Sequence, residues 1–178
     1  MDSKEIRELL TYDDPVHIYP ETSILLKPGD VLYSHKMALS SFAVGHTAII
    51  GEDFRIYHIN RWGKKGHSDS MPIYLSRHKK GEKLTIRRYE DSDIAREAAK
   101  WARKQIDRVE NYIYTRNVGE IRRNYCSKYV WQAYYFGSEE RVDLTARGIN
   151  ATSKCFITPA GLYRKLSKIG DFYNQYNS

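Results

Sequence analysis

One cysteine is placed where its thiol could act as a nucleophile. Cys126 shares a helical stripe with Tyr129 and Val130, which follow it by three and four residues. Asn124 is a favourable N-cap residue and Gly137 a suitable stop, so we expect a helix that starts close to Cys126. The positive end of a helix dipole favours the thiolate, which is the form that attacks electrophiles. The alternative is that Cys126 is only a small buried core residue, as free cysteines commonly are.

Two histidines lie on neighbouring segments that both have the pattern of β-strands. His46 belongs to residues 45–50 and His58 to residues 54–59, and a three-residue hairpin loop joins the two segments. If the hairpin closes symmetrically about Glu52, His46 lies opposite His58, and the Cβ atoms of opposed residues are about 4.5–5.5 Å apart. Both imidazoles would then lie at the edge of the core. The apolar residues that this register pairs are Ile50 with Phe54 and Ala48 with Ile56.

These three residue types can together perform nucleophilic catalysis. A catalytic cysteine needs a base within hydrogen-bond reach and a third group that orients the base. His46 would take the proton from the thiol of Cys126 and return it to the leaving amine, while His58 would hold the His46 ring in place. The backbone N–H of Cys126, at the start of the helix, is a natural donor to an oxyanion. The side chains that are candidates for substrate or oxyanion binding are Tyr112, Tyr114 and Tyr125.

The same residues also have simpler interpretations. A strand histidine is commonly a satisfied core or surface residue, and two histidines on one face can bind a metal, but we find no third ligand in a suitable position. We therefore expect neither a metal nor another cofactor. Glu52 and Asp53 are weaker candidates for orienting His46, because acidic residues in turns are usually exposed. Cys155 is interpreted as structural, so we expect Cys126 to react faster than Cys155 with alkylating reagents.

The composition is that of an ordinary globular domain. Hydrophobic residues make up 41% of the 178 residues and charged residues 29%, which predicts one domain, residues 1–178, with residues 1–25 as an N-terminal extension. Two cysteines are too few for a disulfide framework and form no Cys-x-x-Cys pair. Residues 1–14 contain no apolar run typical of a signal peptide or membrane anchor. We therefore expect no membrane span and a cytoplasmic location.

The positive net charge indicates which kinds of partner the protein could bind. The formal charge is +7 and the isoelectric point about 9.3, which suits an anionic substrate or an anionic polymer. No recognised nucleic-acid-binding motif accompanies the basic residues, so nucleic acid is not expected as a partner. The alternative is that these residues are solvated loops and strand ends. The clusters are Arg61, Lys64 and Lys65; Arg77, Lys79 and Lys80; and Arg122 and Arg123.

Further elements follow from turn and capping signals. Residues 31–34 and 84–89 have the pattern of strands, and residues 142–144 are strand-like. A short amphipathic helix is expected at residues 3–10. A longer helix is predicted from Asp91 to about Val109, and a last short helix starts with Thr158 as N-cap and Pro159 at its first position.

Four short motifs occur in an order that resembles a known family. The chain is similar, from about Lys27 to Leu166, to the YiiX/YaeF-like permuted papain-fold cysteine amidases. These are relatives of the NlpC-type cell-wall peptidases and of lecithin retinol acyltransferase. The motifs are Lys27-Pro28-Gly29-Asp30-Val31-Leu32-Tyr33, Gly45-His46-Thr47-Ala48-Ile49, Tyr125-Cys126-Ser127-Lys128-Tyr129-Val130-Trp131 and Ile157-Thr158-Pro159-Ala160-Gly161-Leu162.

The resemblance implies a fold and roles for the candidate residues. It implies an α+β fold with a central antiparallel sheet packed against helices and the nucleophile at a helix N-terminus, with His46 as base and Cys126 as nucleophile. The third polar residue of the family is often Glu, whereas the matching position here is His58, as in the retinol acyltransferase branch.

The resemblance also implies an activity. It is that of a cysteine hydrolase cleaving an amide bond through a thioester acyl-enzyme, in a small peptide or a cell-wall-derived fragment. The alternatives are an acyltransferase or lipid-ester hydrolase of the same fold, or a non-enzymatic basic module that binds an anionic polymer.

Overall fold

The computed structural model describes residues 15–37, 44–60 and 65–176. The helix predicted at residues 3–10 and most of the basic cluster at residues 61–65 lie outside the described residues. Within the predicted N-terminal extension, Tyr19 is buried against the sheet, and its hydroxyl donates to Oδ2 of Asp30 at 2.9 Å. The chain is therefore anchored to the domain before its first long strand begins.

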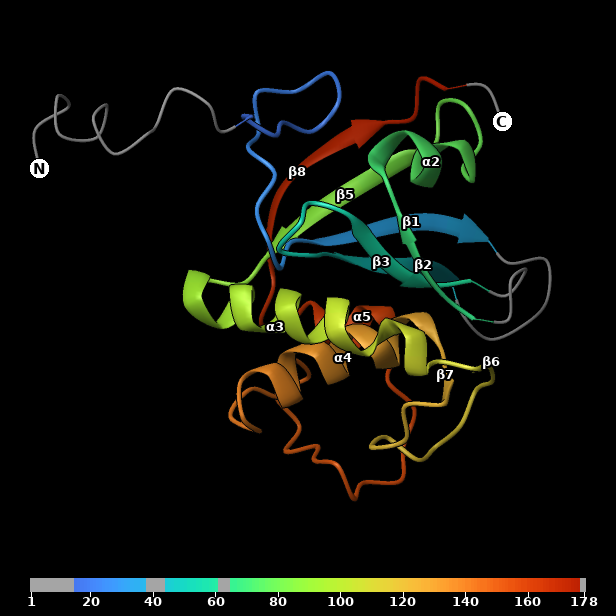
Figure 1. Cartoon of the computed structure of the whole chain (residues 1–178), viewed down its shortest axis with the longest axis vertical. Coiled ribbons are helices and arrows are strands. Elements are labelled where there is room, and N and C mark those ends of the chain that lie inside the picture. The colour runs from blue at the N-terminus through green and yellow to red at the C-terminus, as the bar shows by residue number, and fades with distance from the viewer. Residues whose placement is uncertain (1–14, 38–43, 61–64, 177–178) are drawn as a thin grey trace, which may run out of the picture.

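A six-stranded antiparallel sheet forms the centre of the molecule (Figure 1). Its spatial order is β4-β3-β2-β1-β5-β8, so the first four strands form a meander and β5 and β8 extend the sheet beyond β1. The strands are β1 (Val31–Met37), β2 (Val44–Ile50), β3 (Ile56–Ile59), β4 (Gly66–Asp69), β5 (Lys83–Arg88) and β8 (Ser167–Tyr173). The predicted α+β class with a central antiparallel sheet is confirmed.

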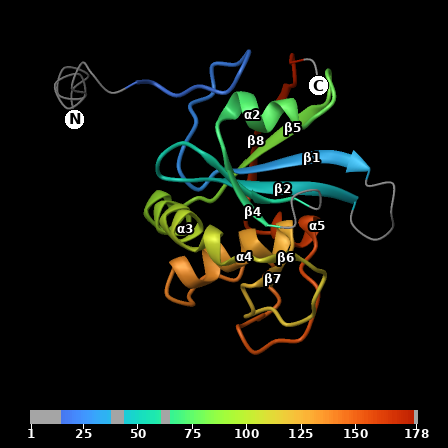
Figure 2. The same ribbon diagram turned by 45° about the vertical axis from the view of Figure 1, so that its right-hand side comes forward.

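Helices cover both sides of this sheet. Three of them, α3, α4 and α5, lie together on one side, and α2 lies on the other (Figure 1 and Figure 2). The helices are α2 (Met71–Ser76), α3 (Ser92–Gln105), the 3-10 turn η1 (Ile106–Arg108), α4 (Cys126–Gly137) and α5 (Pro159–Leu162). A short parallel pair, β6 (Asn111–Tyr112) and β7 (Arg123–Asn124), leads into α4.

Small residues bring α3 and α4 into close contact. The buried face of α3 consists of alanines, and a Cβ atom added at Gly137 of α4 would lie 2.8 Å from the Cα atom of Ala98. The carboxylate of Asp91 caps the first turn of α3, as the sequence predicts. The regular helix ends at Gln105 rather than near Val109, because its last turn tightens into η1. The close packing fixes α4, and therefore its first residue, relative to the sheet.

Strand alternation divides the core into two apolar clusters, one on each face of the sheet. On β2, Ile49 packs in the cluster with α3 and α4, while Ala48 and Ile50 pack in the cluster with α2. On β3, Tyr57 belongs to the first cluster and Ile56 to the second. We call these two sides the α4 face and the α2 face. The alternation assigns each other residue of β2 and β3 to one of them.

The hairpin between β2 and β3 has a different register from the predicted one. Ile50 pairs with Ile56, whereas the sequence-based register paired it with Phe54. That prediction is therefore wrong by two residues. An offset of two keeps each side chain on its own face, so His46 and His58 still share the α2 face. They are diagonal neighbours rather than directly opposed.

The side chain of Asp53 explains the observed register. Its Oδ1 accepts from the N–H of Arg55 at 3.3 Å, and its Oδ2 accepts from the hydroxyl of Tyr57 at 2.8 Å. The N–H of Phe54 donates to the carbonyl of Gly51 at 3.1 Å, and Phe54 adopts a φ of +59°. The N–H of Gly51 then donates to the carbonyl of Arg55 at 2.8 Å. This turn closes the hairpin one pair beyond the predicted loop.

Two other expectations have opposite outcomes. The strand-like residues 142–144 do not form a strand, and a turn begins at Leu144, where the carboxylate of Asp143 accepts from several N–H groups, including that of Ile149 at 3.0 Å. The short helix predicted to start with Thr158 and Pro159 is confirmed as α5, and Thr158 caps it through its side chain.

Candidate functional site

Cys126 is the first residue of α4, and its side chain is 3% exposed. The predicted helix start is confirmed, but the N-cap is Tyr125 rather than Asn124. The amide of Asn124 is buried and donates from Nδ2 to Oε1 of Gln132 at 2.6 Å, so it does not cap the helix. The helix is fixed from behind by the buried Lys128, whose Nζ donates to three backbone carbonyls of the preceding loop.

The thiol of Cys126 lies beside β2, close to the point where the pairing of β2 with β3 ends. Pairing of these two strands ends at Ile49 with Tyr57. Alternate residues of a strand direct their N–H groups to opposite neighbours, so the next N–H of β2 that points toward β3 is that of Thr47. Thr47 lowers the pKa of the Cys126 thiol, so the sulfur lies beside this residue of β2.

Burial decides the protonation state of this thiol. Burial raises the pKa of Cys126, and the neighbouring Thr47 and Ser127 lower it only in part. The Ser127 N–H acts in the direction expected for a helix start, but the net shift is opposite to that expectation. Cys126 therefore holds its proton at neutral pH and needs a base to release it.

Two imidazoles lie on the α2 face of the same two strands. His46 shares this face with Ala48, and His58 shares it with Ile56, by strand alternation. The ring centroids of His46 and His58 are 5.4 Å apart, and the ring planes are nearly perpendicular at 88°. The predicted histidine pair is thus brought together despite the altered register. Thr47, between His46 and Ala48 in sequence, is in contact with the Cys126 thiol, so the sulfur lies close to the strand that carries His46.

His58 is fixed by a carboxylate from β4. Its Nε2 lies 2.8 Å from Oδ2 of Asp69, and the guanidinium of Arg77 donates to both oxygens of Asp69 at 2.6 and 3.2 Å. Burial lowers the pKa of His58 and outweighs the opposing effect of Asp69. Burial would raise the pKa of Asp69, but its bonds to His58 and Arg77 hold it well below the ordinary value. At neutral pH the pair is a neutral imidazole beside a carboxylate.

Tyr74 of α2 closes the site on the same side. Its ring centroid lies 6.5 Å from that of His46 and 5.1 Å from that of His58. Its hydroxyl is buried and has no hydrogen-bond partner among the described residues. Burial, followed by the nearby Cys126, raises the pKa of Tyr74. The phenol is therefore a neutral donor close to the thiol.

The three tyrosines predicted near the site form a cluster at the front of α4. The hydroxyls of Tyr112 and Tyr114 lie 2.8 Å apart, and the ring of Tyr114 lies 5.0 Å from that of Tyr125. The hydroxyl of Tyr125 accepts from the N–H of Ile157 at 2.8 Å, and the side chain is buried. Tyr125 thus anchors the chain beside Cys126, while Tyr112 and Tyr114 lie nearer the surface.

Sequence reasoning missed four residues of this site: Thr47, Asp69, Tyr74 and Arg77. Asp69 stands in a polar stretch that has no apolar alternation, so neither β4 nor its pairing with β3 was predicted. Glu52 and Asp53, the acids that were considered, do not reach the histidines, because they bond to Arg103 and to the hairpin itself. No pattern in the sequence indicates that β2 and β3 separate at Thr47.

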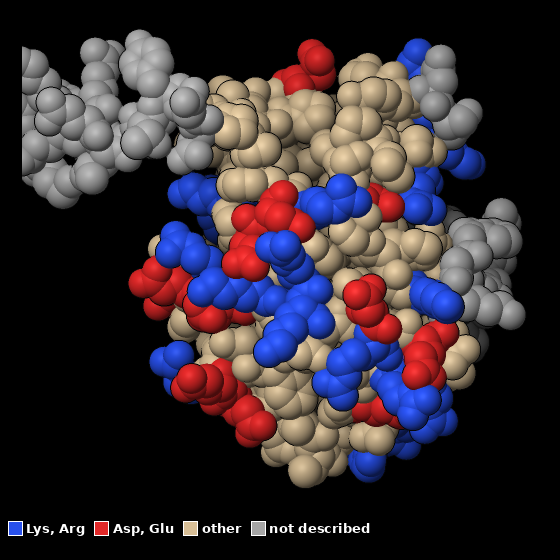
Figure 3. All heavy atoms as spheres, viewed as in Figure 1, with Lys and Arg blue, Asp and Glu red and all other residues tan. Residues whose placement is uncertain are grey.

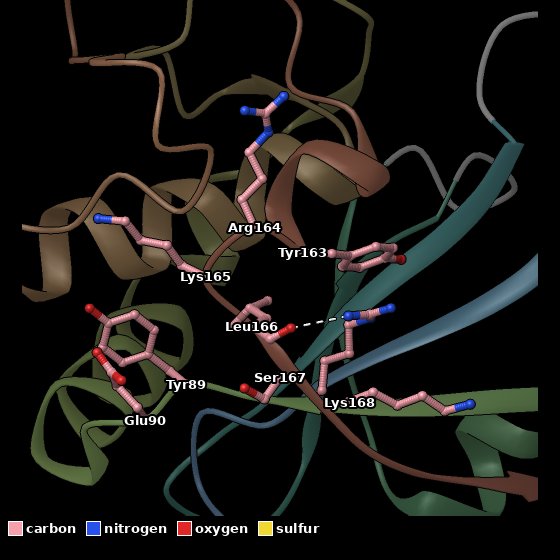
Figure 4. A pocket seen from close by; sticks show the side chains of 9 residues that line it. Tyr89, Glu90, Tyr163, Arg164, Lys165, Leu166, Ser167 and Lys168 are labelled. Atoms are coloured by element: carbon pink, nitrogen blue, oxygen red, sulfur yellow. Dashed lines mark hydrogen bonds between the residues drawn. The ribbon is translucent and has the colours of Figure 1, made fainter.

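A surface hollow of about 480 Å³ lies near the start of β8, and no residue of the candidate site lines it (Figure 4). Arg87 lies at its wall, donating from Nη1 to the carbonyl of Leu166 at 3.0 Å, with its guanidinium 3.8 Å from the Tyr163 ring centroid. The basic side chains around it, Arg164, Lys165 and Lys168 among them, point in different directions. The hollow is therefore basic, but its cations do not converge on one point.

The charged surface is mixed in sign. On the face seen in Figure 3, Lys and Arg alternate with Asp and Glu rather than forming a single basic field. Three of the predicted basic residues are paired with acids: Arg77 with Asp69 at 2.6 Å, Arg122 with Glu110 at 2.9 Å and Arg123 with Glu120 at 2.8 Å. Across residues 15–37, 44–60 and 65–176, no group of three or more His, Cys, Asp or Glu side chains is arranged to hold a metal ion. No helix in that part of the chain has the length and apolar character to cross a membrane.

Comparison with known proteins gives one family, one relative and one similar structure. The family described as lipoprotein N-acylation protein LnsA-like matches residues 9–160. An uncharacterized 30.3 kDa protein of Bacillus thuringiensis is 26% identical over 152 residues, covering 77% of this chain and 52% of that protein. The chain thus spans about half the length of this curated relative. The crystal structure of the metalloprotein yiiX from Escherichia coli O157:H7 matches with a TM-score of 0.56 at 12% identity, covering 83% of this chain and 98% of that chain.

The family match covers most of the chain, and the structural match independently shows the same fold. The predicted resemblance to YiiX-like papain-fold proteins is therefore confirmed. The chain belongs to the LnsA-like family and has the fold of the papain-like acyltransferases and hydrolases.

Proposed function

We propose that the protein is a cysteine acyl-transfer enzyme, in which Cys126 takes an acyl group from a donor as a thioester and passes it to an acceptor. The observation that carries the proposal is the place of the thiol at the start of α4, beside Thr47 of β2, which follows His46 in sequence, while the rings of His46 and His58 lie 5.4 Å apart. A thiol beside one ring that can act as base and a second that can orient it is what nucleophilic catalysis requires. The family match supports the same class of reaction.

In the first half-reaction, His46 takes the proton of the Cys126 thiol as the sulfur attacks the carbonyl carbon of the donor. A carbon–sulfur bond forms, and the carbonyl electron pair moves onto oxygen, within reach of the free N–H groups at the start of α4. The intermediate then collapses, the bond to the leaving group breaks, and the leaving group takes the proton from His46. Because burial raises the pKa of the Cys126 thiol, this step depends on the base rather than on a preformed thiolate.

In the second half-reaction, His46 takes a proton from the acceptor as the acceptor attacks the thioester. The carbon–sulfur bond breaks, and the sulfur regains its proton from His46. Water as acceptor gives hydrolysis, and an amine gives an amide. The description of the family names N-acylation, so we favour an amine as acceptor. Amide hydrolysis of a small peptide or cell-wall fragment, the activity expected from the sequence, would use the same thioester with water.

A chromogenic ester tests the thioester directly. With p-nitrophenyl butyrate in excess, we expect a burst of p-nitrophenol close to one equivalent per chain and a butyryl group on the Cys126 peptide in the mass spectrum. Cys126→Ala should lose the burst and lower turnover by at least about 10³-fold. Cys155→Ala is the matched control and should keep both. Turnover that survives in Cys126→Ala, or a butyryl group found only on other residues, would contradict the proposal.

The acceptor is identified in the same assay. Adding glycinamide, a simple amine, should divert the butyryl group from butyrate to butyryl-glycinamide if the enzyme is a transferase. Release of butyrate alone at every glycinamide concentration would identify a hydrolase. Both products require the Cys126 thioester, so the two outcomes separate the acceptors without altering the nucleophile.

A further inference from the structure

The carboxylate of Asp69 and the guanidinium of Arg77 form an ion pair next to His58, and this pair has no role in the proposed reaction. Asp69 is 6% exposed and lies on the edge strand β4, where it pairs with Ile56 of β3 and is therefore a diagonal neighbour of His58. Arg77, at the C-cap of α2, donates from Nε to Oδ2 of Asp69 at 2.6 Å and from Nη2 to Oδ1 at 3.2 Å. Both oxygens of this carboxylate are thus engaged, and Oδ2 also meets His58.

The two ring nitrogens of His58 differ in their surroundings. Nε2 lies 2.8 Å from Asp69, whereas Nδ1 is buried and has no hydrogen-bond partner among the described residues. A carboxylate can only accept, so Nε2 must carry the proton in this pair. Nδ1 is then a bare lone pair inside the site. The neighbouring ring that could donate to it during the reaction is that of His46, with its centroid 5.4 Å away.

Arg77 changes what a carboxylate would otherwise do to a histidine. An unpaired Asp beside an imidazole favours the charged imidazolium, which has no lone pair to offer. A guanidinium bonded to both oxygens of Asp69 offsets that charge while leaving one oxygen lone pair for Nε2–H. The groups that face His58 are His46 on β2, His67 and Asp69 on β4, Tyr74 on α2 and Arg77 after it. Asp69 is the one acid among them, and Arg77 opposes its effect on the His58 ring in the same direction as burial, which is the larger cause of the lowered pKa of His58.

We propose that Asp69, held by Arg77, is a positioning residue that locks His58 as the neutral tautomer protonated at Nε2, so that Nδ1 serves as the acceptor for His46. The role within catalysis rests on the proposed function, because it takes His46 as the base. The tautomer itself does not rest on it. With Nδ1 of His58 accepting, the His46 ring is held by one of its N–H groups, and its other nitrogen is available to the thiol.

Nitrogen NMR on protein labelled at histidine tests the tautomer without any activity. In the wild type at pH 7 we expect His58 to be neutral, with the proton on Nε2. Asp69→Asn should move the proton to Nδ1, because Arg77 requires the amide oxygen and leaves the amide N–H₂ facing His58. Arg77→Met should leave Asp69 uncompensated, so His58 becomes imidazolium at a higher pH than in the wild type. A wild-type His58 that is charged, or protonated at Nδ1, overturns the proposal even if no variant folds.

Kinetics give the second readout. Asp69→Asn should lower kcat for p-nitrophenyl butyrate by about 10²-fold with little change in KM, and Arg77→Met should shift the acidic limb of the pH profile upward. Glu82→Gln is the matched control, since Glu82 pairs with His78, at 3.1 Å, rather than with His58. It should leave the His58 tautomer and the pH profile unchanged. An unshifted profile in Arg77→Met contradicts the role of Arg77. If the tautomer is as expected but Cys126 forms no thioester, the proposed function fails and the positioning of His58 stands.

Discussion

A buried lysine behind the nucleophile leads to a quantitative prediction. Lys128 lies two residues after Cys126, is fully buried, and donates from Nζ to the carbonyls of Asn117, Glu120 and Arg123 at 3.1, 2.8 and 2.7 Å. No carboxylate oxygen is bonded to it among the described residues. Burial, only partly opposed by Glu120, lowers the pKa of Lys128 to about 8. Its ammonium group ties the loop that precedes α4 to the helix, at the cost of burying a charge.

The pH dependence of this contribution has a definite sign. The pKa of Lys128 falls from 10.5 in the unfolded chain to about 8 in the folded protein, so between these pH values the unfolded chain binds more protons. Its contribution to the free energy of unfolding therefore rises with pH across that window, by about 3 kcal/mol in total. Below pH 8 and above pH 10.5 the contribution is flat.

The variant Lys128→Met measures the contribution of this lysine to the free energy of unfolding. Methionine keeps the length of the side chain but loses three hydrogen bonds from a charged donor, about 1.5–3 kcal/mol each, and recovers the burial cost of about 3 kcal/mol. At pH 7 we expect a net loss of about 2–6 kcal/mol in the free energy of unfolding. Urea unfolding of both proteins from pH 7 to pH 10.5 should show the difference between them growing with pH. Lys104→Met, at an exposed position of α3, is the control and should change little at any pH.

The pH dependence of the stability difference between the wild type and Lys128→Met tests this explanation. A difference that stays flat from pH 8 to pH 10.5 would mean that the lysine is not perturbed by burial. A difference that falls would mean that a carboxylate, with Glu120 the nearest, pairs with it and raises its pKa. Either result would refute the claim that three backbone carbonyls alone hold this cation.

Three further outcomes follow from the described contacts. Tyr74→Phe removes a buried hydroxyl that has no partner, so urea unfolding should show equal or up to about 1 kcal/mol greater stability, and a clear loss would reveal a bond. Asp143→Ala should cost about 2–3 kcal/mol at pH 7. That cost should shrink in thermal melts below pH 4, because burial raises the pKa of Asp143 but its hydrogen bonds lower it to about 2. Iodoacetamide at pH 7 should modify Cys155 before Cys126 in peptide mass spectra, which reverses the order expected from the sequence, because burial raises the pKa of Cys126. Labelling of Cys126 should increase as pH rises, and faster labelling of Cys126 at pH 7 would show a preformed thiolate.

Strand and helix periodicity predict the elements that carry Cys126, His46 and His58. The helical stripe behind Cys126 predicts α4, and the two strand-like segments predict that His46 and His58 share a face. These conclusions survive because they depend on side-chain alternation, which a register offset of two residues preserves. The exact pairing depends on the bonds of one turn carboxylate, Asp53, and turn acids carry no periodic signal.

The polar residues around His58 could not be predicted from periodicity. Asp69 lies in a short polar edge strand, and only the pairing of β4 with β3 brings it to His58. Arg77 reaches the same carboxylate from the end of α2, eight positions later. The thiolate expected at the helix start was a sound local argument, but it could not include the burial of Cys126 by the sheet, which dominates the pKa.

The candidate site lies where the hydrogen-bonded pairing between β2 and β3 ends. If β2 and β3 remained paired past Ile49, the N–H of Thr47 would donate to a carbonyl of β3. The backbone of β3 would then occupy the space beside Thr47. The Cys126 sulfur lies beside Thr47 at this point, and Thr47 lowers the pKa of the thiol. Strand alternation places the rings of His46 and His58 on the α2 face, whereas α4 packs on the other face of the sheet. The proposed reaction therefore requires the thiol and the two imidazoles to meet where the pairing of β2 with β3 ends.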